Sequence, residues 1–302
     1  MIKRMEALAR ELQADNPGVE SLMLYQDGET RFSHRFVPEG LPRPIYSHTK
    51  SYISTAVGMV YDMGKLRLED TLGDLFPEYR SVVTDEGVLS ITLRDLLTMR
   101  SGFGGAYLMA KGRREGEGGE DFLAYMLSKP LVDKPGSKFV YSNADSYLAG
   151  CMAAKAYGKP LLPFLYTNLF KPMDMGYPLW ETDPHGVPFG GSGLYLHLGD
   201  MMKLGILYLH DGVWKGQRIL SHEWVSMAGS KQADTGHPDS WSSDYGFQFW
   251  GIGQEKGAFR ADGAYGQFSI ILPGRNAVVG AQSSEQNDSG KFIALLRKHL
   301  FE

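Results

Sequence analysis

Several features that mark other classes of protein are scarce in this chain of 302 residues. It has one cysteine, Cys151, so an intrachain disulfide is impossible, and its apolar neighbours in 148–154 indicate a buried, inert thiol. No apolar run reaches the length needed to span a membrane. The first residues form an amphipathic helix start without the apolar centre of a signal peptide. We therefore expect a cytoplasmic chain, or an exported one whose signal has been removed.

Neither sign of charge dominates, and metal-ligand patterns are missing. The net charge of -4 and the pI near 6.1 give no reason to expect nucleic acid or a membrane as a partner. The eight histidines are scattered without ligand spacing, so neither a metal nor another cofactor is expected. His48 is expected to serve in packing or at a rim. The composition, 43% hydrophobic and 22% charged, is that of an ordinary globular protein.

Strand-like segments lie at both ends of the chain, and helical patterns lie between them. Segments 21–25 and 30–33 flank an Asp-Gly turn and predict a hairpin. After residue 245, short aromatic and β-branched runs predict four strands, at 246–250, 258–261, 267–272 and 277–281. Apolar periodicity predicts helices at 1–15, 52–63 (beginning at or just before Ser47), 91–99, 120–128, 145–157, 161–169, 200–209 (with Asp200 as N-cap), 221–228 and 291–299.

This arrangement predicts an α+β fold in which the N-terminal hairpin joins the C-terminal strands in one antiparallel sheet. We expect a five-stranded sheet with flanking helices and a mostly helical insertion. The chain would form a single catalytic domain, 1–302, with a sheet subdomain from 1–46 plus 240–302 and a helical subdomain from 47–239. The glycine-rich, charged segment 104–119 is expected to be an exposed loop that borders the site.

A Ser-x-x-Lys motif, Ser47 and Lys50, stands at the start of the helix predicted around 52–63. In a helix these two side chains lie on one face, one turn apart. A neutral amine can take the serine proton, and the N–H groups and dipole at the helix start can stabilise an oxyanion. The motif alone is weak, because a chain of this size contains about one by chance. A serine cap followed by a solvated lysine is the alternative.

Further motifs follow in a fixed order. Thr92–Gly102 (TLRDLLTMRSG) is followed by Tyr141-Ser142-Asn143, a Tyr-x-Asn motif at a helix start, and later by Gly263-Ala264-Tyr265-Gly266-Gln267 at a strand. In this order the chain, from about Leu24 to Leu272, resembles the superfamily of class C β-lactamases, D-Ala-D-Ala peptidases and esterases. The resemblance covers nearly the whole chain and implies a β-lactamase/D,D-peptidase-like fold.

The resemblance implies a role for each motif. Ser47 would be the acylated nucleophile, and Lys50 its proton acceptor or the group that tunes its partner. Tyr141 would act as general base and then as acid toward the leaving group, while Asn143 would orient Lys50 or bind substrate. The backbone N–H groups of Ser47 and Ala264 would form the oxyanion hole. Either base would need a pKa lowered by roughly 3 units to act at neutral pH. The segment 190–193 would line the pocket.

A second Tyr-x-Asn motif, Tyr166-Thr167-Asn168, is not excluded by spacing alone. It lies within an amphipathic helical pattern, where packing accounts for the tyrosine, so Tyr141 is preferred. Trp241, in a polar segment, is a candidate wall of the substrate pocket.

The chain departs from the family at Ala261-Asp262-Gly263, where the family usually has Lys or His, then Thr or Gly, then Gly. β-Lactams and D-Ala-D-Ala peptides carry a carboxylate that the family's cation and hydroxyl recognise. Alanine supplies neither group, and Asp262 would repel a carboxylate unless Arg260 compensates. This departure favours a substrate with a neutral or cationic acyl side.

The sequence thus predicts a serine hydrolase that cleaves a small ester or amide through an acyl-enzyme. Ser47, Lys50 and Tyr141 would be catalytic, and Asn143, Asp262, Gly263 and Ala264 would bind or orient the substrate. The alternatives are a D,D-peptidase or β-lactamase proper, and a penicillin-binding or sensor protein that acylates without turnover. No metal or cofactor takes part in this mechanism.

Overall fold

A computed structural model describes residues 1–38, 41–239 and 241–302. Eleven α-helices are present within these ranges. They are α1 (Ile2–Ala14), α2 (Thr49–Asp62), α3 (Leu72–Leu75), α4 (Leu93–Leu97), α5 (Ala110–Arg114), α6 (Phe122–Leu127), α7 (Asn143–Tyr157), α8 (Leu161–Leu165), α9 (Leu198–Leu209), α10 (His222–Gly229) and α11 (Ser289–Phe301).

The main sheet is antiparallel, which confirms the predicted α+β class, but its described part has eight strands rather than five. Their order is β2 (Glu29–Arg35), β1 (Val19–Gln26), β13 (Ala277–Ser283), β12 (Gln267–Leu272), β11 (Phe259–Gly263), β10 (Trp250–Gly251), β9 (Asp244–Tyr245) and β8 (Ala233–Asp234). The count was too low because β8, β9 and β10 have two residues each, too few for an alternating pattern. Two small sheets hold β3 (Arg43–Pro44), β5 (Leu194–Leu196) and β4 (Leu179–Trp180), and β6 (Val213–Trp214) and β7 (Gln217–Arg218).

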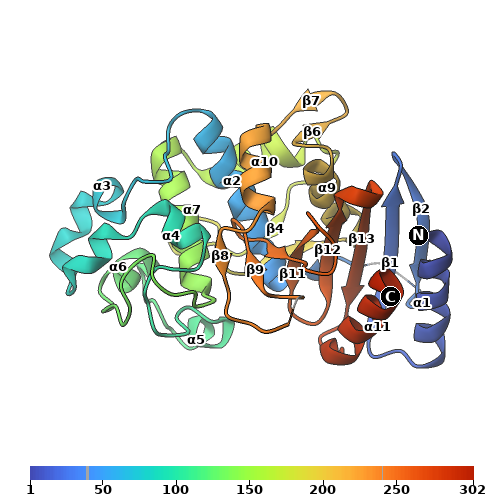
Figure 1. The fold of residues 1–302 in the computed structure, drawn as a ribbon. Coiled ribbons are helices and arrows are strands. Elements are labelled where there is room, and N and C mark those ends of the chain that lie inside the picture. Colours follow the sequence, from blue (N-terminus) through green and yellow to red (C-terminus); the bar gives the residue numbers. More distant parts are fainter. Residues whose placement is uncertain (39–40, 240) are drawn as a thin grey trace.

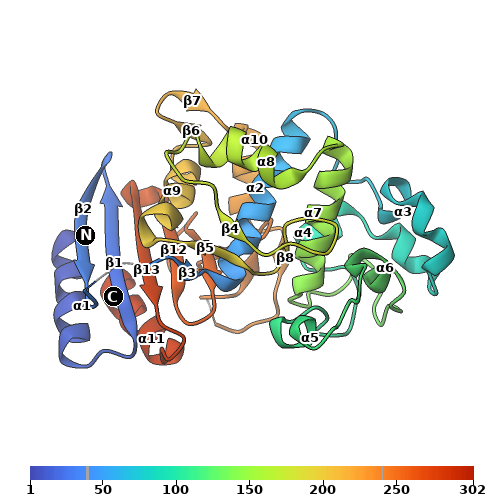
Figure 2. The ribbon, with the colours of Figure 1, turned by 180° about the vertical axis from the view of Figure 1, so that it is seen from behind.

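Helices cover both faces of the sheet (Figures 1 and 2). Because successive strand residues point to opposite faces, Ile271 joins the core that contains α2, α7 and α9, whereas Ile270 joins the core under α1 and α11. Both residues are fully buried. The helical middle of the chain, with α3 to α7, lies at the end of the molecule opposite β1 and β2 (Figure 1). The N- and C-terminal helices lie beside each other on the sheet.

Most predicted elements are present, and the exceptions concern their bounds. Helix α9 begins at Leu198 with His197 as N-cap, so Asp200 lies in its first turn and is not the cap. The segment predicted as a strand at 246–250 contributes only Trp250 to a strand. There Gln248 has a φ of 63°, and its side chain donates to the carbonyls of Leu96 and Leu97.

The division into a sheet subdomain and a helical subdomain stays a prediction. The proposed boundary at residue 240 lies outside the described residues. The sheet also includes β8, which precedes that boundary in the chain. No helix in the described ranges is both long and apolar enough to cross a lipid bilayer.

Candidate active site

Ser47 lies in a 3-10 turn, Tyr46–His48, immediately before α2, and not within the α-helix itself. The turn is held from both sides. Its preceding residue, Ile45, donates its N–H to Leu194 O and accepts from His48 N. The strand β11 comes so close that a Cβ on Gly263 would lie 2.1 Å from Ile45 O. Glycine at 263 is therefore required by the contact between β11 and the turn that carries Ser47.

His48, the neighbour of Ser47, is fully buried and points away from the cavity that Ser47 lines. Its Nε2 lies 2.9 Å from Ser269 Oγ. Burial lowers the pKa of His48 to about 3, so the imidazole is neutral. It is a packing residue, one of the two roles expected for it.

Tyr141 reaches the same cavity from the start of α7. Ser142 caps this helix by accepting from Asp145 N, which places Tyr141 just before the first turn. Ser47 and Tyr141 both line a cavity of about 310 Å³. Desolvation raises the pKa of Tyr141, while hydrogen bonding with the Ser47 side chain opposes the rise. The phenol of Tyr141 is therefore protonated at neutral pH.

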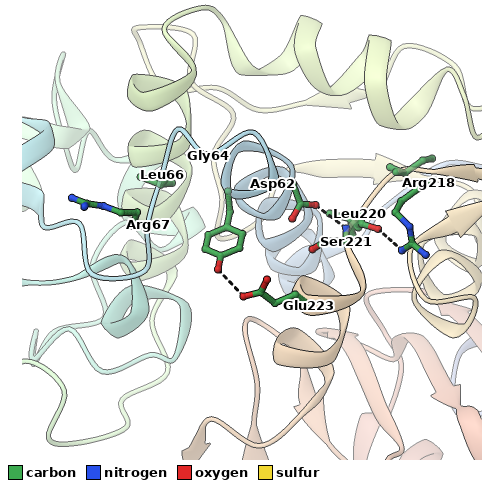
Figure 3. Close-up of a pocket in the computed structure, with 10 residues that line it drawn as sticks. Asp62, Gly64, Leu66, Arg67, Arg218, Leu220, Ser221 and Glu223 are labelled. Carbon is green, nitrogen blue, oxygen red and sulfur yellow. Dashed lines mark hydrogen bonds between the residues drawn. The ribbon is translucent and has the colours of Figure 1, made fainter.

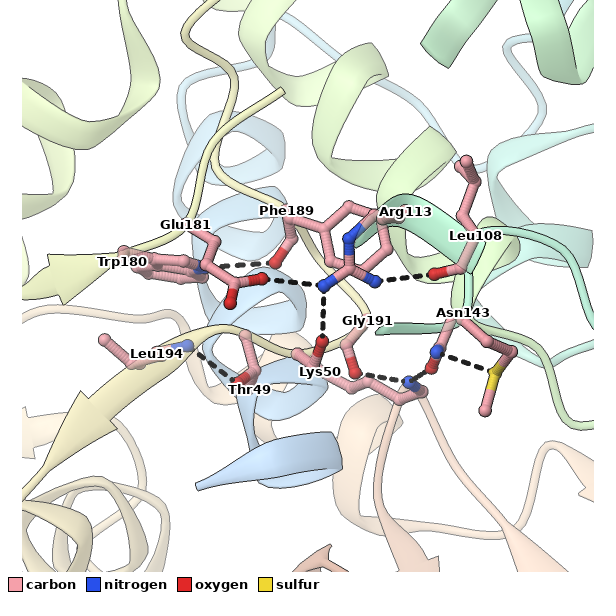
Figure 4. Close-up of polar contacts among 12 residues, drawn as sticks. Thr49, Lys50, Leu108, Arg113, Asn143, Trp180, Glu181, Phe189, Gly191 and Leu194 are labelled. Atoms are coloured by element: carbon pink, nitrogen blue, oxygen red, sulfur yellow. Dashed lines mark hydrogen bonds and ion pairs between the residues drawn. The ribbon is translucent and has the colours of Figure 1, made fainter. Parts of the chain in front are cut away.

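Lys50 is 1% exposed and lies between α7 and the segment 190–193 (Figure 4). Its Nζ donates to Asn143 Oδ1 at 2.5 Å and to Gly191 O at 2.8 Å, and lies 5.1 Å from the centroid of the Tyr141 ring. Desolvation lowers the pKa of Lys50 to about 7. Two N–H groups of the amine are engaged in these hydrogen bonds. The third position on Nζ carries a proton when the amine is charged and a lone pair when it is neutral.

Arg113 was not singled out by the sequence, yet it fixes the segment that Lys50 contacts. It comes from 104–119, which does border the site, but its side chain is only 10% exposed. The guanidinium donates to Leu108 O, Glu181 Oε2 and Ser192 Oγ, and lies 3.7 Å from the centroid of the Phe189 ring (Figure 4). Because Glu181 and Ser192 lie far from Arg113 in the sequence, no local pattern could have identified Arg113.

The far wall of the cavity carries a charged pair from β11. Arg260 Nε donates to Asp262 Oδ2 at 2.9 Å, and both residues line the cavity with Ser47. Arg260 is therefore paired with Asp262 at this wall. Desolvation lowers the pKa of Arg260 and raises that of Asp262, and the pairing opposes both shifts.

Aromatic side chains complete the walls. Trp241 lines the cavity, as its polar surroundings suggested, and so does Trp250, which the sequence did not distinguish from core tryptophans. The rings of Trp250 and Tyr141 stack with centroids 5.3 Å apart. Tyr245 meets Tyr141 edge-on at 6.1 Å. These contacts fix the direction of the Tyr141 ring.

Ala264 lines the cavity at the turn between β11 and β12, opposite Ser47. The turn uses left-handed conformations at Tyr265 (φ 64°) and Gly266 (φ 89°). β10 pairs with β11 only at Phe259 and Arg260, so beyond Arg260 this side of β11 is directed to the cavity. Ala264 and Ser47 thus line the same cavity.

Three residues considered from the sequence lie elsewhere. Tyr166 begins a π-helical turn, Tyr166–Phe170, and packs against Tyr177 with ring centroids 5.0 Å apart. Asn168 donates to Phe164 O within the same segment. Cys151 is buried in α7, as expected, and burial raises the pKa of its thiol. None of these three side chains lines the cavity at Ser47.

A larger cavity, about 660 Å³, lies between the end of α2 and residues 218–223 (Figure 3). Its polar groups pair with one another: Tyr61 Oη donates to Glu223, and Ser221 N to Asp62. Arg218 donates to Leu220 O. Size alone would favour this cavity, but its paired side chains do not form a nucleophile and base, and the chemistry of the Ser47 cavity decides between them.

Known proteins resemble this chain in sequence. A family model described as Beta-lactamase matches residues 5–298. The 6-aminohexanoate-dimer hydrolase of Paenarthrobacter ureafaciens is 24% identical over 80% of this chain and 65% of its own length. Esterase EstB of Burkholderia gladioli is 29% identical over 47% of this chain and 40% of its own length. The chain thus spans less than two thirds of either relative.

Solved structures share the fold. The penicillin-binding protein homologue from Pyrococcus abyssi superposes with a TM-score of 0.72 at 19% identity, over 99% of this chain and 76% of that one. The predicted β-lactamase/D,D-peptidase-like fold is therefore confirmed, with the strand count corrected as above.

Proposed function

We propose that this chain, which belongs to the Beta-lactamase family, is a serine hydrolase that cleaves an ester or amide bond through an acyl-enzyme on Ser47. Two of the matching relatives are named as a 6-aminohexanoate-dimer hydrolase and as an esterase, which supports hydrolysis of an amide or an ester. The observation that carries the proposal is the convergence of three groups: Ser47 and Tyr141 in one cavity, with the Lys50 amine beneath the Tyr141 ring.

In the proposed mechanism the proton of Ser47 passes to neutral Lys50 as Oγ attacks the substrate carbonyl. A Lys50 pKa of about 7 makes the neutral amine available, whereas the raised pKa of Tyr141 keeps its phenol protonated. Tyr141 then suits the role of acid toward the leaving group more than that of resting base. The N–H groups of Ser47 and Ala264 would hold the oxyanion. The proton on Lys50 would then pass to the Tyr141 phenolate, which restores both groups to their starting forms. Water would release the acyl group, with Lys50 taking a proton from the attacking water and the Ser47 oxygen regaining one as it leaves.

Within the family, the cavity favours an esterase or linear-amide hydrolase over an efficient β-lactamase. A β-lactam carboxylate needs a free cation beside the nucleophile. Here the cation at the cavity wall, Arg260, is already paired with Asp262. Slow cleavage of nitrocefin compared with p-nitrophenyl butyrate is the expected result, and fast cleavage would contradict this assignment.

The test of the mechanism combines turnover with detection of the intermediate. Steady release of p-nitrophenol from p-nitrophenyl butyrate is expected, with a transient adduct of the acyl mass on Ser47. Ser47→Ala should abolish both signals, whereas Ser54→Ala, a buried serine of α2 outside the cavity wall, should retain them. A stoichiometric burst without recovery would instead identify a non-turnover binding or sensor protein. Retained turnover in Ser47→Ala would exclude Ser47 as the nucleophile.

A further inference from the structure

The two charged residues of β11, Arg260 and Asp262, differ in how far their side chains are exposed to the cavity. Arg260 and Asp262 are two positions apart, so their side chains lie on the same face of the strand. The side chain of Arg260 is 2% exposed, whereas that of Asp262 is 21% exposed. A molecule in the cavity therefore meets the carboxylate before the guanidinium.

Arg260 is held in the cavity wall by hydrogen bonds from every nitrogen of its guanidinium group. Besides Nε, which donates to Asp262, Nη1 donates to Trp241 O and Nη2 to Ser242 Oγ at 3.1 Å. The guanidinium also lies 4.2 Å from the centroid of the Trp241 ring. Each of its three nitrogens thus has an acceptor, and turning Arg260 toward a substrate anion would break buried hydrogen bonds.

Asp262 is less fully engaged. A carboxylate can accept roughly four hydrogen bonds, and Arg260 Nε supplies one of them, at Oδ2. The rings of Tyr141 and Trp250, stacked against each other, stand in the same cavity. Aromatic faces attract cations and, like the carboxylate, offer nothing to an anion.

We propose that Asp262 selects substrates whose acyl group carries a positive charge and rejects those whose acyl group carries a negative one. This inference rests on the proposed function, because it concerns the substrate of the acyl-enzyme on Ser47. Its physical basis is charge complementarity in a partly desolvated cavity, where a like charge is repelled more strongly than in water.

The experiment uses three p-nitrophenyl esters that differ in the end of the acyl chain. One carries a γ-trimethylammonio group on a butyryl chain, the second its uncharged tert-butyl isostere, and the third a γ-sulfonate. Each kcat/KM is divided by the rate of hydrolysis of that ester in buffer, so that intrinsic reactivity cancels. The cationic ester is expected to exceed the anionic one by about tenfold or more.

Asp262→Asn is the decisive variant, since it keeps an oxygen acceptor for Arg260 and removes the charge. The ratio of cationic to anionic kcat/KM should fall about tenfold or more, and Asp262→Glu should restore most of it. Asp234→Asn removes the same charge from a carboxylate on β8 whose side chain is 71% exposed, outside the cavity wall, and should leave the ratio unchanged. A general loss of structure lowers all three esters alike and does not alter the ratio.

The result that overturns the inference is a ratio near one in the natural protein, or a ratio that Asp262→Asn does not change. Failure of the proposed function looks different: no ester is turned over. In that case the three esters are titrated into Ser47→Ala by calorimetry. Tighter binding of the cationic ester, lost when Asp262→Asn is added, supports the inference without catalysis, and equal binding of all three refutes it.

Discussion

Desolvation favours the uncharged forms of Lys50 and Tyr141 at the same time. It lowers the pKa of the amine to about 7 and raises that of the phenol. The two residues therefore divide the chemistry: Lys50 is able to accept a proton at neutral pH, and Tyr141 is able to give one. Two further charges act on Lys50 in opposite directions. Asp145 raises its pKa and Arg113 lowers it.

A pH profile tests this division directly. If neutral Lys50 is the base, kcat/KM for an ester rises with pH through a limb near pH 7, because the active form appears above the pKa of Lys50. Arg113→Gln removes a charge that lowers this pKa, so the limb should move to higher pH. Asp145→Asn removes a charge that raises it, so the limb should move to lower pH. If the limbs of the two variants coincide, or shift in the same direction, the titrating group is not Lys50.

Residues that belong to a motif could be predicted from sequence, and residues that act through distant contacts could not. Ser47, Lys50 and Tyr141 were found because each belongs to a short pattern with its own chemistry. Arg113 contacts Glu181 and Ser192, 68 and 79 positions away, through no pattern at all. The roles of the motif residues remain predictions that the variants above address.

At the scale of elements, the site depends on how closely β11 approaches the turn that carries Ser47. The turn is a 3-10 segment rather than the first turn of α2, and its neighbour Ile45 presents its carbonyl to Gly263. On the other side Ile45 is bonded to Leu194 of β5. Ser47 is thus clamped between two strands, and the position of its Oγ depends on the absence of a side chain at 263.

Gly263→Ala should therefore impair catalysis more than stability. The new Cβ, 2.1 Å from Ile45 O, must push β11 and the turn apart, at a cost of about 1–3 kcal/mol in the free energy of unfolding. Because the same shift separates Ser47 from Ala264, we expect kcat/KM to fall by roughly a hundredfold, the effect of displacing reacting groups by about 1 Å.

Gly199→Ala in α9, whose Cβ would meet nothing within 4 Å, is the matched control and should be neutral or slightly stabilising. Steady-state kinetics give kcat/KM and urea unfolding gives the free energy of unfolding for both variants. A natural value of kcat/KM in Gly263→Ala would show that the position of Ser47 does not depend on the close contact at residue 263.

The strands that sequence predicted well have five or more residues in the structure. Segments 267–272 and 277–281 are β-branched or apolar and buried on both faces. Segment 246–250 is rich in aromatic residues, which also favour strands, yet Phe247 and Phe249 fill the helical core from an irregular segment. Tertiary packing overrides the local strand preference there, because the Gln248 side chain donates hydrogen bonds to the carbonyls of Leu96 and Leu97 at the C-terminal end of α4.

At the scale of the whole molecule, the sheet separates two hydrophobic cores that have different roles. One lies between the sheet and the helices α2, α7 and α9, and its elements carry Ser47, Lys50 and Asn143. The other lies under α1 and α11, and Trp241 and Ile293 connect it with the cavity. The first core sets the geometry of the reaction, while the second mainly holds the sheet together.

Alanine substitution of two equally buried leucines, one in each core, tests these different roles. Leu148 of α7 and Leu296 of α11 are both fully buried, so Leu148→Ala and Leu296→Ala should each lower the free energy of unfolding by about 2–5 kcal/mol. Only Leu148 lies in the helix whose first residue, Asn143, holds the amine of Lys50. Relaxation around the new cavity should shift that contact, so kcat per folded molecule falls in Leu148→Ala and stays near the natural value in Leu296→Ala. Active-site titration with a stoichiometric acylating agent counts the folded molecules in each preparation. Equal loss of kcat in both variants would mean that the sheet transmits strain between its two faces and that the cores do not act separately.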